Sequence, residues 1–192
     1  MLPHALPLVG AFVLSALVLA LPGRSAFTPE HRGEVGIGYM KLRLPGAEQA
    51  LRAALAAAPT LPRARLALGM HLTAEKRFDE AIAVLEAARS AAGTSDLEPG
   101  LALGVALQLS GRTDAARGVL EDLGRRFPED GRPAFNLAML AIKGGDEAQA
   151  RARLQEALGK TLPTDQMRLD AAVTLRNLKE AHTRPDAKQK GK

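Results

Sequence analysis

Apolar residues recur along this chain at a spacing typical of paired helices. Leu-Ala-Leu-Gly stands at residues 66–69 and again 35 residues later at 101–104, and a looser copy follows at Leu137 and Ala138. After each copy, apolar residues three or four apart continue through a short polar turn into a second stretch. This period of 3.6 predicts two amphipathic helices in each copy.

The turns between the two stretches carry helix-start residues. The three turns read AEKRFDEA, LSGRTDAA and KGGDEAQA, and we expect their aspartates, Asp79, Asp114 and Asp146, to cap the second helices. Pro99 and Pro133 suit the first turn of a helix, where a missing N–H costs nothing. Small residues at the same place in each first helix, Gly69, Gly104 and Ala138, predict close contact with Ala81, Ala116 and Ala150 twelve residues on.

This pattern resembles the tetratricopeptide repeat, a helix–turn–helix unit of 34 residues. The resemblance rests on the Leu-Gly pair, the mid-repeat Gly, the alanines of the second helix and a closing Pro, although Lys76 replaces the usual turn Gly. It implies an all-α fold that is a right-handed α–α superhelix, and the uncharged start of the chain predicts an N-terminal hydrophobic helix before it. The expected organisation is a signal peptide or membrane anchor (1–27), a degenerate repeat (28–61), three repeats (62–96, 97–130 and 131–164), a capping helix (165–182) and a basic disordered tail (183–192).

The first 27 residues contain one charged residue, Arg24. The run from Ala5 to Pro22 has 18 uncharged residues, which is borderline for a membrane-spanning helix. We expect a membrane protein with a single-pass N-terminal anchor at residues 5–22. The alternative is a signal peptide cleaved after Val18-Leu19-Ala20, which would make the protein periplasmic or secreted.

Charge and cysteine content limit the kinds of partner and of metal site expected for this chain. Of 26 basic and 21 acidic residues, five basic and one acidic lie in segments 1–27 and 183–192, which leaves 21 and 20 in the body. A nearly neutral body argues against nucleic acid as a partner. The chain has no cysteine, which excludes disulfides and thiolate metal sites.

No motif predicts catalysis, a cofactor or a metal. Gly159-Lys160-Thr161 lacks the first glycine and the preceding strand of a phosphate-binding loop, and the four histidines form no pair at i, i+4. We therefore expect no catalytic residue, no metal and no cofactor, and the chain is not expected to be an enzyme.

The resemblance implies a protein-binding scaffold instead. In the family, the second, fifth, ninth and twelfth positions of each repeat line a concave groove, which here predicts Arg63, Leu66, Met70, Thr73, Glu98, Leu101, Val105, Gln108, Arg132, Phe135, Met139 and Ile142. The fifth and ninth positions are apolar, so the Lys and Asn that clamp a carboxylate in chaperone-binding members are absent.

Such a groove suits a partner helix or hydrophobic peptide. The open alternatives are an assembly or maturation factor of a membrane or secreted complex, similar to those of cytochrome c biogenesis or pilus assembly, and a structural membrane protein that self-associates as a homo-oligomer. The groove residues could also be covered by the capping helix or the N-terminal segment, or belong to the core.

Overall fold

A computed structural model describes residues 28–41, 45–93 and 95–183 of the chain. Over these residues every regular element is an α-helix, and the only β-type contact is an isolated bridge between Asp130 and Thr161. The all-α expectation is confirmed for this part of the chain. The chain divides into two compact units at Ala91/Ala92.

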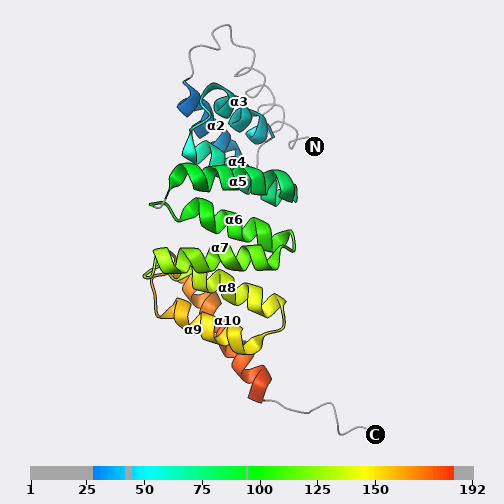
Figure 1. Ribbon diagram of the computed structural model, residues 1–192, viewed down its shortest axis with the longest axis vertical. Helices are drawn as coiled ribbons and strands as arrows, with labels where there is room; N and C mark the ends of the chain where they lie inside the picture. The colour runs from blue at the N-terminus through cyan, green and yellow to red at the C-terminus, as the bar shows by residue number, and fades with distance from the viewer. Residues whose placement is uncertain (1–27, 42–44, 94, 184–192) are drawn as a thin grey trace, which may run out of the picture. The chain divides into compact units, whose positions relative to one another are not determined.

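The first unit contains four helices, α2 (Pro29–Lys41), α3 (Ala47–Ala57), α4 (Pro62–Ala74) and α5 (Phe78–Ala92) (Figure 1). The glycine-rich stretch that fits the repeat pattern poorly nevertheless forms α2. A Cβ on its Gly36 would lie 2.7 Å from Cγ of Leu51 in α3, so the missing side chain allows these helices to approach closely. Helices α2 and α3 therefore form a pair.

The second unit contains α6 (Glu98–Leu109), α7 (Thr113–Arg126), α8 (Arg132–Lys143), α9 (Glu147–Leu158) and α10 (Asp165–Thr183). The pair α6–α7 is antiparallel, because Gly100 lies against Leu123 while Gly104 lies against Leu120. Pro99 and Pro133 stand at the N1/N2 positions of α6 and α8, as the sequence predicts.

The expected small-residue contacts are shifted by one helical turn. The atoms nearest a Cβ on Gly69 belong to Leu85 and those nearest a Cβ on Gly104 belong to Leu120, rather than to Ala81 and Ala116. The alanines are themselves fully buried. In α4 and α6 the glycine therefore receives a leucine of the second helix, whereas α8 has Ala138 at this place.

The expected caps are correct at one turn of three. Asp146 precedes α9 and its side chain accepts a hydrogen bond from the Gln149 N–H at 2.9 Å. Asp79 and Asp114 instead lie inside the first turns of α5 and α7. There a carboxylate does not cap the helix, although it interacts favourably with the N-terminal end of the dipole.

The predicted localisation, a membrane protein held by a single-pass N-terminal anchor, is wrong. No helix within residues 28–41, 45–93 and 95–183 combines the length and apolar character needed to cross a membrane. The longest, α10, carries charged residues such as Arg168, Asp170 and Arg176, and charges are costly in hydrocarbon. Residues 5–22 lie outside the described residues, and the cleaved signal peptide stays a prediction.

Candidate functional site

The predicted groove residues lie on the first helices α4, α6 and α8, one row in each. They fall into three groups: exposed residues, partly buried residues, and one residue that belongs to the core. The exposed ones are Arg63, Met70, Glu98 and Ile142, the partly buried ones are Leu66, Thr73, Val105, Gln108, Arg132, Phe135 and Met139, and the buried one is Leu101.

In the first unit, the polar groups of the α4 row already have partners. Arg63 forms an ion pair with Glu34 of α2 at 2.6 Å, which joins the two first helices. The Thr73 hydroxyl donates to the Gly69 carbonyl at 2.8 Å. Between them lie Leu66 and Met70, and Met70 is 49% exposed. This row therefore presents an apolar centre with no unsatisfied polar group at either end.

In the second unit, an ion-pair cluster links α6 and α8 at their N-terminal ends. The Arg132 guanidinium contacts Glu98 at 2.5 Å and Asp130 at 2.8 Å. Burial would raise the pKa of Asp130, but hydrogen bonds from the side chain and backbone of Arg132 hold that pKa below its usual value. The Arg132 guanidinium is therefore paired with two carboxylates, one of which belongs to the predicted groove residue Glu98.

The C-terminal ends of α6 and α8 each carry an exposed apolar side chain. The Lys143 ammonium donates to the Gln108 carbonyl at 3.0 Å, which brings the two helix ends together. The residues beside this bond, Leu109 and Ile142, are 54% and 37% exposed. Leu109 was not among the predicted groove residues, because it follows the twelfth position. The only feature of the sequence that could have identified Leu109 is that it is a leucine at the end of a predicted helix.

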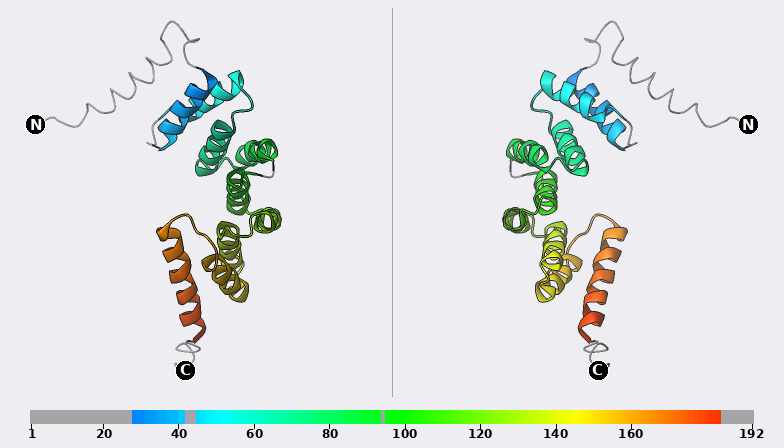
Figure 2. Two further views of the ribbon diagram at one scale, coloured as in Figure 1. Left: turned by 90° about the vertical axis from the view of Figure 1, so that its left-hand side faces the viewer. Right: turned by 90° about the vertical axis from the view of Figure 1, so that its right-hand side faces the viewer.

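The C-terminal helix α10 helps to bury part of the α8 row. Phe135 and Met139 are partly buried and pack against a cluster that includes Ala171 and Leu175 of α10. Figure 2 shows α10, in orange, running alongside the α8–α9 pair. This covering by the capping helix is one of the alternatives left open by the sequence. The large apolar side chains that stay exposed in the described part of the second unit are Leu109 of α6, Ile142 of α8 and Leu169 of α10.

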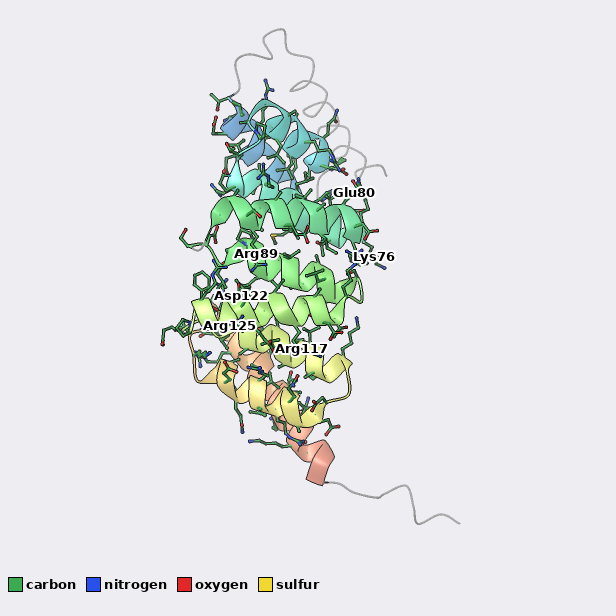
Figure 3. The ribbon with its side chains drawn as sticks, viewed as in Figure 1. Lys76, Glu80, Arg89, Arg117, Asp122 and Arg125 are labelled. Carbon is green, nitrogen blue, oxygen red and sulfur yellow. The ribbon has the colours of Figure 1, made fainter. Side chains whose placement is uncertain are left out.

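A second polar cluster lies on the second-helix side of the first unit. Arg77 and Arg52 each bond both Glu48 of α3 and Glu80 of α5, at distances from 2.7 to 3.0 Å. The hydrogen bond from Arg52 lowers the pKa of Glu48, and the hydrogen bonds from Arg77 lower that of Glu80. Glu80 is labelled at the start of α5 in Figure 3. Each carboxylate is shared between two guanidinium groups, so this cluster is an internal tie between helices.

The Gly159-Lys160-Thr161 segment serves as an inter-helix turn. Gly159 caps α9, and the Lys160 ammonium pairs with Glu156 at 2.7 Å. Thr161 exchanges backbone hydrogen bonds with Glu129 and Gly131 in the turn before α8. Within the described part of the chain, no three His, Asp or Glu residues are grouped so that they could hold a metal ion.

The chain resembles known proteins both in sequence and in fold. A sequence model described as tetratricopeptide repeat matches residues 42–96 and 101–166. No curated protein matches the chain. Among solved structures, the chain resembles the APC/C hetero-tetramer Cut9–Hcn1 (20% identity, TM-score 0.70, 91% of this chain and 34% of that chain), yeast Tom70 (16%, 0.66, 81% and 34%) and MamA of MSR-1 (21%, 0.60, 78% and 86%). The chain spans about a third of the first two matched chains. At these identities the likeness concerns the fold.

Proposed function

This chain belongs to the tetratricopeptide repeat family, and from that premise we propose that it is a non-catalytic scaffold that holds a helix or peptide of a partner protein. The family is built from stacked helix pairs whose first helices offer a continuous surface for protein partners. Fold alone does not define a function, so the proposal depends on the surface that these helices offer.

The supporting observation is that the first-helix rows combine an exposed apolar centre with charges that are already paired. Met70, Leu109 and Ile142 are large apolar side chains exposed on α4, α6 and α8. Arg63 is paired with Glu34, and Arg132 with Glu98. A partner that binds to such a surface removes apolar area from water, which stabilises the complex by about 25 cal/mol per Å². It therefore suits the apolar face of a partner helix or a hydrophobic peptide rather than a charged terminus.

Site-specific photo-crosslinking of the full chain tests the proposal. A photoreactive residue at Ile142 or Met70 is expected to capture one partner in constant stoichiometry. The matched control is Ala152, an exposed residue on the second helix α9, from which that partner should not be captured. Ile142→Glu replaces an exposed apolar side chain with a charged one and is expected to reduce capture at least tenfold, while the variant stays folded because the position is exposed.

The pattern of crosslinks also separates the alternatives. Equal capture from Ala152 and Ile142 would contradict the assignment of the face. A crosslink from Ile142 to a second copy of this chain would assign the face to self-association instead.

A further inference from the structure

The C-terminal helix α10 packs along α9 and completes a buried cluster at the edge of the predicted groove. Ala171 and Leu175 join this cluster with Ala138 of α8 and Leu154 of α9, and Phe135 and Met139 pack against it. The fifth and ninth positions of the third repeat therefore lie against a cluster that a helix of the same chain completes. The α8–α9 pair is in this sense a helix-binding surface whose occupant, α10, is already in place.

The contacting stripe of α10 shows what this surface accepts. Met167, Ala171, Leu175 and Leu178 recur at intervals of four, four and three residues and all belong to the cluster or pack against it. The fully buried member, Ala171, is small, and its neighbours along the stripe are long and unbranched at Cβ. No member of the stripe carries a charge. The neighbouring Ala172 and Arg176 lie on the exposed side of the helix.

The attachment of α10 is slight for a helix of 19 residues. Of its residues 165–180, only Ala171 and Leu175 are buried, whereas α8 buries six of its twelve. Arg168 holds its start through the carbonyls of Leu158 and Lys160, at 3.1 and 3.3 Å. Elements with few buried apolar contacts open with less free energy than the unit to which they belong.

From these observations we propose that α10 is a displaceable occupant, and that unit 2 accepts in its place a partner helix with the same uncharged stripe. That stripe is a small residue with Met or Leu four residues before it and four and seven residues after it. The inference rests on the proposed function for the choice of face, and it adds the class of partner and its regulation. While tethered, α10 competes at an effective concentration of about millimolar, so a free helix binds only weakly until α10 is released.

A peptide of residues 164–183 is the probe, because it includes Thr164, whose hydroxyl accepts a hydrogen bond from the Met167 N–H at the start of the helix. Its binding is measured to the full chain, to Ala171→Glu and to Ala172→Glu. The same substitution is thus made once in the contacting stripe of α10, at Ala171, and once on its exposed side, at Ala172. We expect Ala171→Glu to bind the peptide at least tenfold more tightly than the wild type, and Ala172→Glu to behave like the wild type. A peptide that itself carries Ala171→Glu should not bind.

Equal binding to all three chains, or binding to none, would overturn the proposal. Hydrogen exchange of the wild-type chain gives an independent test that does not depend on any variant folding. The amides of residues 168–180 are expected to exchange at least tenfold faster than those of α8, and equal protection would also overturn the proposal. Failure of the peptide, with capture from Ile142 intact, would overturn this inference alone. Loss of capture from Ile142 alone would overturn the proposed function.

Discussion

At the residue scale, a glycine of the first helix lies in close contact with a leucine of the second helix in the α4–α5 and α6–α7 pairs. A Cβ on Gly69 would lie 2.4 Å from Cγ of Leu85, and one on Gly104 would lie 2.8 Å from Cδ2 of Leu120. Both leucines are fully buried. In an interior packed at crystal density, such leucines have little space into which they can move. The glycine is therefore required by its neighbour, although it lowers the intrinsic stability of the helix.

Gly104→Ala should reverse the order expected from helix propensity. In a helix interior, alanine is more stabilising than glycine by about 0.5–1 kcal/mol. Here, however, the Cβ of alanine would overlap Leu120, and overpacking typically costs about 1–3 kcal/mol. We expect a net loss of about 1 kcal/mol in the free energy of unfolding, measured by urea denaturation. Gly118→Ala in α7 is the control, because its Cβ would meet no atom within 4 Å, and it should stabilise the chain. A stabilising Gly104→Ala would contradict the packing described.

At the scale of the element, three first helices end in the same way. The N–H groups of Arg77, Arg112 and Asp146 each bond a carbonyl five residues back. This is the six-to-one bond of a Schellman motif, which places the preceding residue in the left-handed conformation. That residue is Gly111 (φ 83°) or Gly145 (φ 76°) in two turns, but Lys76 (φ 61°) in the other.

Lys76→Gly should therefore stabilise the chain. A side chain in the left-handed region costs about 1–2 kcal/mol, and Lys76 is exposed (Figure 3). We expect a gain of about 1 kcal/mol in the free energy of unfolding, measured by thermal and urea denaturation. The reverse change, Gly111→Lys, should cost a similar amount, because nothing lies within 4 Å of its Cβ. A neutral result for both would contradict the requirement for left-handed backbone at this turn.

At the scale of the whole chain, carboxylates are paired with cations in both units. In the first unit these pairs join α3 to the start of α5, whereas in the second unit they join residues close in sequence. Glu48 and Glu80 bond arginines in the first unit, and Asp130 and Glu156 bond arginines or lysine in the second. Each of the four has a pKa below its usual value, as hydrogen bonds from the cations outweigh burial. The folded chain therefore binds protons less readily than the unfolded chain at these groups.

Acid is accordingly expected to destabilise the fold. Carboxylates with lowered pKa values contribute stability that is fully present above their usual pKa, about 4.5 for Glu and 3.8 for Asp. That contribution is lost as the pH falls through the lowered values. The melting temperature should be flat from pH 7 to about pH 5 and fall below about pH 4.5. Arg77→Gln removes a partner of Glu48 and Glu80 and should make the fall shallower. An equally steep fall in that variant would show that this cluster does not contribute.

Periodicity along the chain was sufficient to predict the helix pairs, the prolines in the first turns and the family. These features depend on the local 3.6-residue repeat and on backbone geometry, and both are determined by residues close together in the sequence. Asp146 was identified as a cap by the same local logic, whereas Asp79 and Asp114 were misplaced by two residues, because helix ends depend on where the neighbouring helix packs.

The character of the surface was decided only by the tertiary structure. Leu101 has the same repeat position as Leu66 and Phe135, yet it is buried, while Phe135 packs against a cluster completed by a helix that follows thirty residues later. Gly69 and Gly104 each meet a leucine sixteen residues on because two antiparallel helices meet at an axial offset set by side-chain packing. The spacing of residues within one helix indicates which of them share a face, but not which side chains of another helix will cover that face.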